Sequence, residues 1–388
     1  MESKKVSIAF SGDIGFDKYM DKKWLDESLL SNDILEFFHT ANHVCINVEG
    51  AVVDAETIPN KTEFFHAMNP NAVTVFNKMH ADIWSIGNNH TMDAGVEGVL
   101  STLDFAKLNK VKTIGAGENL EQASSPIYLN GAGGIGLINL SYMNEKTPAN
   151  DTQAGFFRWD DMTEIERRIK EIKEKCRWCV IVAHGGDEFS PIPNTYTRDR
   201  YIKYLELGAD VVVGHHPHVV ENYELFENGK AIFYSLGNFI FDTDYQRAHI
   251  NTDIGVLLKL EFNETDFSFN AIGVKINRNN QRTTKTDLPD IFTNVSSCEY
   301  NTLIPLSSFA FIQEEKRKLL YLDRERFSVF TETDWENYFF TDEHDGYVKG
   351  EHMDLAICYQ NAKPFTKNTW QNSKLQKVKE YLLKHKPV

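Results

Sequence analysis

The sequence lacks several features that mark specialised classes of protein. Its 388 residues include only five cysteines, an odd number at irregular spacing, which is typical of reduced thiols rather than of a disulfide framework. No apolar run is long enough to cross a bilayer, so we expect no integral membrane segment. Basic residues are outnumbered by acidic ones, 41 against 56, which gives a formal net charge of −15. This negative charge argues against nucleic acid or an anionic membrane as the main partner.

What is present indicates a globular protein. Hydrophobic residues make up 41% and aromatic residues 12% of the chain, which is enough for one large core, with or without a smaller satellite core. The first five residues lead directly into an apolar, β-branched run, without the pattern of a signal peptide. We therefore expect a cytoplasmic protein.

Five short apolar runs in the first 220 residues each end on residues that can bind a metal or move a proton. The runs span 6–10, 44–46, 83–86, 180–182 and 211–213, and they are followed in turn by Asp13, Glu49, Asn88-Asn89-His90, His184 and His215-His216-Pro217-His218. Buried strands have this composition, and in open α/β sheets ligands bind beyond the carboxyl ends of the strands. The five endings should therefore converge on one edge of a sheet.

Each ending also has an explanation without function. Gly12-Asp13 alone is typical of a turn, Asn88-Asn89 of helix caps, and His184 of a hydrogen-bonded core histidine. The segment His215-His216-Pro217-His218 is harder to explain in this way, because its three imidazoles must be desolvated or become cationic together. Since chance would have to supply such endings repeatedly, we interpret them as one site whose oxygen and nitrogen ligands suit a divalent manganese, iron or zinc ion.

The same residues lie in segments that resemble the motifs of the CapA/PgsA family, the bacterial capsule and poly-γ-glutamate synthesis proteins. The segments cover about residues 5 to 245 and include Phe10-Ser11-Gly12-Asp13, Asn47-Val48-Glu49-Gly50, Asn88-Asn89-His90-Thr91-Met92-Asp93, His184-Gly185-Gly186-Asp187-Glu188, Gly214-His215-His216-Pro217-His218 and Tyr234-Ser235-Leu236-Gly237-Asn238. That family resembles in turn the calcineurin-like metallophosphoesterases. The resemblance therefore implies an α/β fold, a two-sheet metallophosphoesterase-like sandwich with a metal centre at the strand ends.

The resemblance also implies roles for individual residues. The implied metal ligands are Asp13, Glu49, Asn89, His184, His216 and His218. The implied catalytic residues are His90 as acid/base, Asp93 as its orienting carboxylate and His215 facing the substrate. Further substrate contacts are expected at Asn47, Asn88, Glu188 and Asn238. The early Asp-x-His of the phosphoesterases reads Asp13-Ile14-Gly15 here, so one ligand is missing and we expect one ion per chain.

Strand-like runs alternate with helical periodicity through the motif region, and short alternating strands follow from 231 to 277. A polar stretch at 277–282 then marks a boundary. We therefore predict a CapA-like domain over residues 1–280 and a partly helical C-terminal appendage over 281–388, with helices at 312–321 and 372–384. The appendage is expected to pack on the sandwich or cap the site, and the alternative is a partner-docking module.

Three functions remain open. The first is a metal-dependent hydrolase of a phosphoester or a related ester or amide, in which His90 protonates the leaving group. The second is a peptide epimerase that exchanges an α-proton, and the third is a non-catalytic component of polymer synthesis. The expected ligand is an anionic small molecule, or a peptide or polymer.

Overall fold

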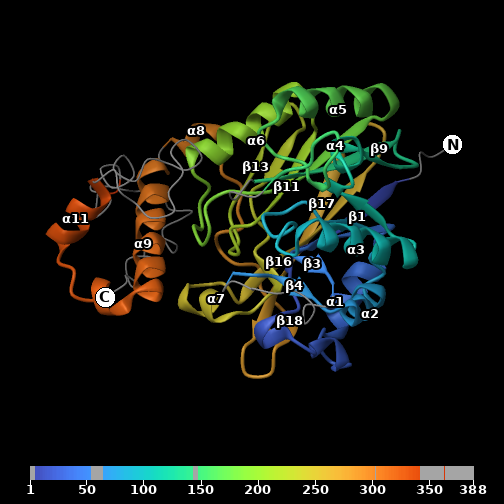
Figure 1. Ribbon diagram of the computed structural model, residues 1–388. Helices are drawn as coiled ribbons and strands as arrows, with labels where there is room; N and C mark the ends of the chain where they lie inside the picture. The colour runs from blue at the N-terminus through green and yellow to red at the C-terminus, as the bar shows by residue number, and fades with distance from the viewer. Residues whose placement is uncertain (1–4, 54–63, 143–146, 302, 341–361, 363–388) are drawn as a thin grey trace.

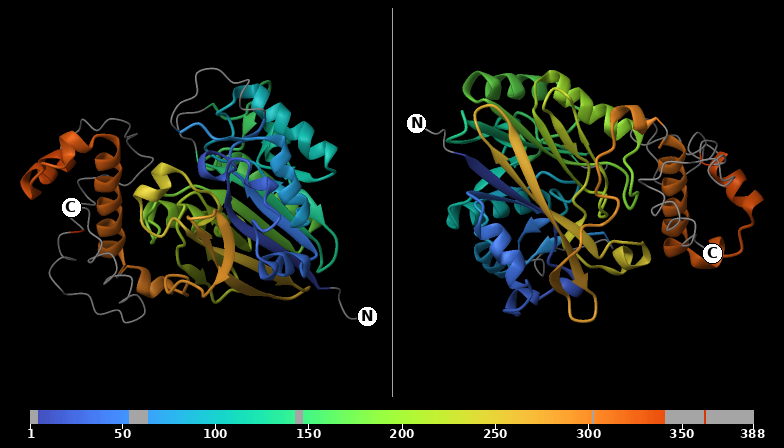
Figure 2. Two further views of the ribbon diagram at one scale, coloured as in Figure 1. Left: turned by 90° about the horizontal axis from the view of Figure 1, so that it is seen from below. Right: turned by 180° about the vertical axis from the view of Figure 1, so that it is seen from behind.

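Two β-sheets stack face to face, and helices cover both outer faces of the stack (Figure 1). The computed structural model describes residues 5–53, 64–142, 147–301, 303–340 and 362. Two further views place the C-terminal helices at the side of this sandwich (Figure 2). The predicted two-sheet α/β sandwich is confirmed.

The larger sheet has eight strands within the described residues. Its order is β18 (Arg282–Thr286), β17 (Phe267–Asn277), β16 (Ile254–Phe262), β1 (Val6–Ile14), β2 (His43–Val48), β5 (Ile83–Ser85) and β6 (Lys112–Ile114), with β15 (Asn238–Ile240) also paired to β1. Strands β1, β2, β5 and β6 run parallel, so their carboxyl ends share one edge of the sheet. Strands β16, β17 and β18 continue the sheet in antiparallel pairs on the other side of β1.

The smaller sheet has six strands in the described part of the chain. Its order is β13 (Tyr223–Leu225), β14 (Ala231–Phe233), β12 (Val211–His215), β11 (Trp178–His184), β9 (Ile135–Ser141) and β8 (Ile127–Leu129). The four central strands are parallel, and both edge strands are antiparallel to their neighbours. Two short strand pairs lie outside the main sheets: β3 (Ala51–Val52) with β4 (Ala67–Met68), and β7 (Ala116–Gly117) with β10 (Gly155–Phe156).

The central strands are apolar on both faces because each face packs against a separate layer. Along β1, Ile8 and Phe10 belong to the core between the sheets, whereas Ala9 faces the helical layer. Helices α1 (Asn32–His39), α2 (Val73–Lys78) and α3 (Gly95–Leu108) contribute to the core on the outer face of the larger sheet. Helices α5 (Met162–Lys175) and α6 (Thr195–Leu207) do the same for the smaller sheet. Short helices α4 (Leu120–Ser124) and α7 (Asp244–Ala248) complete this part.

Between residues 297 and 340, the described chain that follows the sandwich is largely helical. It forms α8 (Ser297–Tyr300), α9 (Ile304–Leu322), α10 (Arg324–Phe327) and α11 (Glu332–Phe340), which are drawn in orange in Figure 1. The first half of α9 joins the core between the sheets through Leu306 and Phe309. Its second half packs with α10 and α11 around Phe327 and Trp335.

The predicted helix at 312–321 lies within α9, and the one predicted at 372–384 lies outside the described residues. The domain boundary at residue 280 stays a prediction, and β18 extends the larger sheet just beyond it. Among the described helices, none is both long and apolar enough to cross a membrane.

Candidate metal centre

The carboxyl ends of parallel strands from both sheets bring the predicted ligands together. Asp13 lies near the end of β1 and is paired in register with Asn47 of β2. Glu49 follows β2 directly, and its backbone N–H donates to the carbonyl of Ile14. In the smaller sheet, His184 ends β11 and is in register with the last residue of β12. The predicted convergence of strand ends therefore exists as a spatial cluster.

Two fully buried carboxylates form the centre of this cluster. The carboxylate of Asp13 lies 3.3 Å from Nδ1 of His215 and 3.3 Å from Nδ1 of His218. Oε1 of Glu49 lies 3.5 Å from Nε2 of His218 and 3.6 Å from Nε2 of His184. Neither carboxylate oxygen of Glu49 accepts a hydrogen bond from any described residue. Such a buried acid retains lone pairs that can bind a cation.

Among the described residues, three sets of three side chains have ligand atoms within 4.8 Å of one another. They are Glu49 with His184 and His216, Asp13 with Glu49 and His218, and Glu188 with His216 and His218. Glu49 belongs to the first two sets. Oδ1 of Asn89 lies 2.9 Å from Nε2 of His184, which places a fourth donor beside the first set. The buried oxygen and nitrogen donors fit a divalent cation.

Burial and neighbouring charges perturb the ionisable groups of the cluster. Burial raises the pKa of Glu49 well above its usual range, and burial together with neighbouring His216 lowers the pKa of His184. Burial also opposes charge on His218, but the carboxylates of Glu49 and Asp13 outweigh it and raise the pKa of His218 to about 10. A cation bound by His218 itself would take the place of this proton, because an imidazole binds a metal only in its neutral form.

The backbone at two of the predicted ligands is in the left-handed region. The φ angle is 98° at His216 and 58° at His218, on either side of Pro217. Non-glycine residues adopt such angles at a cost of about 1–3 kcal/mol each. The loop after β12 is thus held in a conformation that aims its imidazoles at the cluster.

His90 lies beside the cluster in the loop that follows β5. Its Nδ1 is 2.8 Å from Oδ2 of Asp93, which fixes the ring, and its Nε2 is 3.9 Å from Oε1 of Glu49. The side chain of Asn88 accepts a hydrogen bond from the backbone N–H of His90 and donates one to the carbonyl of Val48. Asn88 therefore anchors the loop that carries His90.

Two other residues that are predicted to contact substrate, Asn47 and Asn238, contact side chains of candidate metal ligands. Nδ2 of Asn47 donates to Oδ1 of Asp13 over 2.7 Å and lies 3.3 Å from Nδ1 of His184. Oδ1 of Asn238 is 2.9 Å from Nδ1 of His218. Both amides are placed to orient cluster side chains, and their contact with substrate stays a prediction.

His66 is a site residue that the sequence motifs do not mark. Its Nδ1 is 2.5 Å from Oδ2 of Asp17, and its backbone N–H donates to Oδ2 of Asp93. Its ring packs edge-on against His90 with 4.3 Å between the centroids. The only signal in the sequence is a histidine before the two-residue strand β4, which is too weak to single it out.

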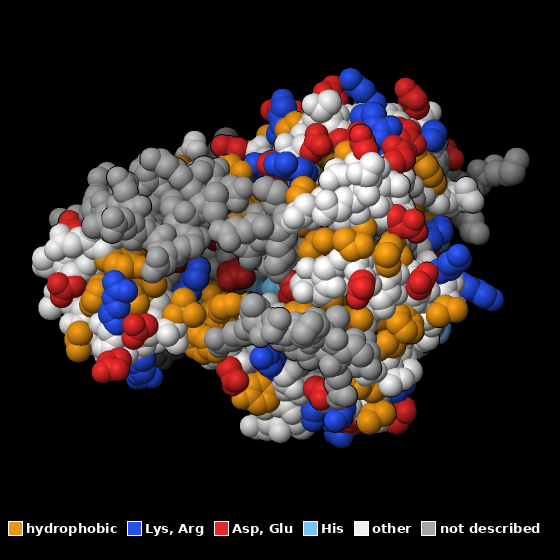
Figure 3. All heavy atoms as spheres, in the orientation of Figure 1, with side chains coloured by type: hydrophobic (Ala, Val, Ile, Leu, Met, Phe, Trp, Pro, Cys, Tyr) orange, Lys and Arg blue, Asp and Glu red, His pale blue; other side chains and the backbone are white. Residues whose placement is uncertain are grey.

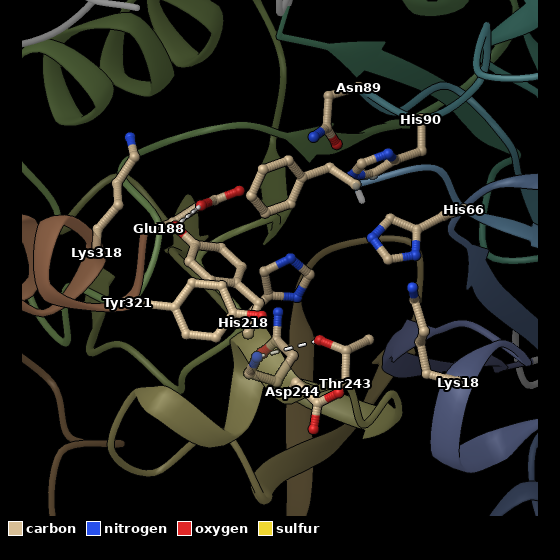
Figure 4. A pocket seen from close by; sticks show the side chains of 13 residues that line it. Lys18, His66, Asn89, His90, Glu188, His218, Thr243, Asp244, Lys318 and Tyr321 are labelled. Carbon is tan, nitrogen blue, oxygen red and sulfur yellow. Dashed lines mark hydrogen bonds between the residues drawn. The ribbon is translucent and has the colours of Figure 1, made fainter. Parts of the chain in front are cut away.

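A cavity of about 200 Å³ opens beside the cluster. Figure 4 shows His66, Asn89, His90, Glu188 and His218 around it, with Lys18 on one side and Lys318 and Tyr321 of α9 on the other. In the space-filling view of Figure 3, a hollow between the sandwich and the α9 side exposes a histidine beside acidic side chains. The candidate centre is therefore accessible to a ligand.

A two-sheet α/β sandwich with a carboxylate and imidazole cluster at its strand ends defines a class of candidate metalloproteins. Residues 7–243 match the family model described as "Bacterial capsule synthesis protein PGA_cap". This match covers more than half of the chain, so the chain belongs to that family, and the predicted family membership is confirmed.

Two curated relatives carry corresponding names. The chain is 32% identical over 251 residues to the PGA biosynthesis protein CapA of Bacillus subtilis (strain 168), covering 62% of this chain and 65% of that protein. It is 24% identical over 257 residues to the Capsule biosynthesis protein CapA of Bacillus anthracis, covering 63% of this chain and 62% of that protein. The matched region is thus just under two thirds of each relative's length. Among solved structures, a 5'-nucleotidase precursor from Thermus thermophilus aligns at 13% identity with a TM-score of 0.42, over 72% of this chain and 56% of that chain.

Proposed function

We propose that this protein is a metal-dependent hydrolase of a phosphoester or a related ester or amide, acting in capsule or poly-γ-glutamate synthesis. The observation that carries the proposal is the state of Glu49, which is fully buried and accepts no hydrogen bond at either oxygen from the described residues. Leaving such a group unsatisfied costs about 1–3 kcal/mol or more. A bound cation would offset this cost. The name of the Bacillus subtilis relative, a PGA biosynthesis protein, supports the link to polymer synthesis.

One ion per chain, manganese, iron or zinc, is the stoichiometry that the donors support. Glu49, His184 and His216 together with Asn89 offer four donors, whereas the set of Asp13, Glu49 and His218 offers three. The missing ligand of the second set falls at Gly15, where an added Cβ would lie 2.7 Å from the ring of Phe241. That ring fills the space a side chain at this position needs, so the three-donor set should hold a metal weakly.

Some residues of the chain would hold the cation, and another would transfer a proton. A divalent cation held by the four-donor set would polarise the scissile phosphoryl or carbonyl group. His90 would donate a proton from Nε2 to the leaving group, because Asp93 holds its Nδ1 and leaves Nε2 facing the cluster. His215, beside Asp13, would contact the substrate.

The second candidate, a peptide epimerase, is raised by a specific observation. Two imidazoles, His90 and His66, line one pocket, and each is paired with a carboxylate, Asp93 and Asp17 respectively. Epimerisation by two bases needs them on opposite sides of an α-carbon. The two rings instead adjoin each other with 4.3 Å between centroids, which favours the hydrolase.

The test measures metal content and turnover together. Protein purified without chelator should contain about one divalent ion per chain and should hydrolyse bis(p-nitrophenyl) phosphate or a p-nitrophenyl ester. His90→Asn should retain the metal and lose at least about 100-fold in kcat, the usual contribution of a general acid. The matched control is His80→Asn, because His80 is exposed and its φ of 59° suits asparagine.

Other outcomes would select the alternatives. Deuterium incorporation from heavy water into a peptide, without hydrolysis, would indicate an epimerase. Metal-loaded protein that binds an anionic polymer but turns over none of these substrates would favour a non-catalytic role.

A further inference from the structure

The wall of the pocket that faces the metal centre comes from a part of the chain outside the matched family region. Lys318 and Tyr321 of α9 line the cavity that also contains Asn89, His90 and His218. The family match ends at residue 243, whereas α9 begins at Ile304. A helix outside the matched family region therefore completes a pocket that is otherwise lined mainly by residues within that region.

Helix α9 is held in place by contacts that reach the cluster. His249 and Glu314 are both buried, and Nδ1 of His249 lies 2.8 Å from the carboxylate of Glu314. The ring of Phe189 stacks on His249 with 3.7 Å between centroids and lies 5.9 Å from His218 on its other side. Because α9 is also anchored in the main core through Leu306, the wall is preorganised for ligand binding.

Cations stand on two sides of the pocket. Figure 4 shows Lys318 extending from α9, while Lys18 lies on the far side next to His66. The nearest acid recorded for Lys318 is Glu315, at 3.9 Å, and the Lys318 side chain is 43% exposed. Glu315 and, to a smaller degree, Glu188 raise the pKa of Lys318, so the ammonium group is charged at neutral pH. It is free to turn toward a ligand, since a pair at 3.9 Å is held only loosely.

Aromatic rings line the same pocket as this cation. The ring of Tyr321 lies 5.2 Å from that of Tyr245, and the hydroxyl of Tyr245 donates to Oε2 of Glu188. A ligand in the pocket can therefore contact cluster residues such as His218, the ammonium group of Lys318 and an aromatic surface.

We propose that Lys318 binds a second anionic group of the substrate, a carboxylate or a phosphate, remote from the bond that reacts at the metal centre. The pocket then selects ligands with two anionic groups over ligands with one. This inference rests on the proposed function in one respect only, which is the assignment of the end of the ligand that reacts. Lys318 is a specificity residue in this scheme and takes no part in proton transfer.

The experiment compares pairs of probes by calorimetry on the full-length, manganese-loaded protein. One pair is butyrate and glutarate, and the other is propyl phosphate and propane-1,3-bisphosphate. Wild type should bind at least one dianion more tightly than its monoanion, and the pair that shows this identifies the anion as carboxylate or phosphate. Lys318→Gln should weaken binding of that dianion about fivefold, since a partly exposed ion pair contributes up to about 1 kcal/mol. Binding of the monoanion should stay unchanged, and Lys318→Arg should behave as wild type.

The matched control is Lys203→Gln. Lys203 also pairs with a glutamate three residues away on a helix, at 3.1 Å, and is 52% exposed, but it lies on α6 and does not line the pocket. Its variant should bind both probes of each pair as wild type does, which separates a local contact from a change in net charge.

Three results would overturn the inference. They are equal affinity of wild type for both members of each pair, equal weakening of monoanion and dianion by Lys318→Gln, and a loss of manganese affinity in that variant. The last would mean that Lys318 serves to position Glu188. Because binding is measured without turnover, an absence of hydrolysis would refute the proposed function and leave this inference standing.

Discussion

Replacing Glu49 by glutamine should strengthen the metal-free fold and abolish metal binding. The substitution keeps the shape of the side chain and removes its charge. In the native site the carboxylate is fully buried, its oxygens accept no hydrogen bond from described residues, and the nearest imidazole nitrogens lie 3.5 Å and 3.6 Å away, on His218 and His184. His218 keeps a partner in the variant, because Asp13 lies 3.3 Å from its Nδ1.

The two effects have opposite signs, and the loss of metal is the larger. An unsatisfied buried group costs about 1–3 kcal/mol, so removing the charge should stabilise the metal-free protein by about 1 kcal/mol, or about 1 °C in Tm. Metal at a hundred times its Kd stabilises a native protein by about 2.7 kcal/mol, or about 3 °C here. Glutamine should lose that gain, because Glu49 belongs to both donor sets of the centre and a neutral amide replaces its charge in each.

The gain in stability of the metal-free Glu49→Gln variant over the wild type should depend on pH. Burial raises the pKa of Glu49 above 4.5, so the destabilising charge is absent below that pH and develops as pH rises through the raised pKa. The variant and the wild type should therefore have similar stability near pH 4.5, and the variant should be the more stable toward neutral pH.

Scanning calorimetry with EDTA and with excess manganese measures both effects, and elemental analysis reports the bound ion. The matched control is Glu221→Gln, because Glu221 is also buried with a raised pKa but belongs to none of the three ligand sets found among the described residues. That variant should keep the metal-induced rise in Tm. A Glu49→Gln protein that keeps this rise, or that is less stable than wild type in EDTA at neutral pH, would refute the reasoning.

Two further predictions concern the unequal donor sets and a surface network. His184→Ala should lower manganese affinity more than His218→Ala, because His184 belongs to the four-donor set, and equal losses by calorimetry would contradict this. Partial burial opposes ionisation of Glu171, but hydrogen bonds from Lys175, Tyr128 and Arg168 lower its pKa to about 2. Its contribution to stability should therefore be present above about pH 4.5 and be lost as pH falls toward 2, so Glu171→Gln should show a smaller loss of stability between these values in urea titrations than wild type.

The positions of the strand ends were predictable because the local pattern of apolar runs agrees with the general rule for parallel sheets. Short apolar runs predict buried parallel strands, and parallel strands place their carboxyl ends at one edge, so Asp13, Glu49 and His184 could be brought together without coordinates. The same runs indicated a mixed α/β fold, and the resemblance to a known family implied the two-sheet sandwich. Helical periodicity indicated the helix that lies within α9, but not where this helix docks.

Sequence reasoning missed residues whose contacts do not follow from strand register or helical spacing. His66 joins the site through Asp17 and Asp93, and neither contact follows from strand pairing or helical spacing. The docking of α9 includes one buried pair, His249 with Glu314, between segments that share no motif. The contact of Asn238 with the ring of His218 also could not be predicted, because the sequence does not show which neighbour an amide side chain faces.

The net charge of −15 does not conflict with an anionic ligand, because charge acts locally at a partly enclosed site. At physiological ionic strength the Debye length is about 8 Å, so scattered surface acids farther away than this have little effect on a group inside the pocket. The charges that act on a ligand are those of the residues that line the pocket. The basic residues are Lys18, Lys318 and His218, and the acidic ones are Glu188 and Asp244. A bound divalent ion would shift this local balance toward positive charge, whereas without it the buried acids Glu49 and Asp13 face only imidazoles such as His218. Metal binding and anion binding should therefore be coupled, and a ligand with two anionic groups gains from both ends of the pocket.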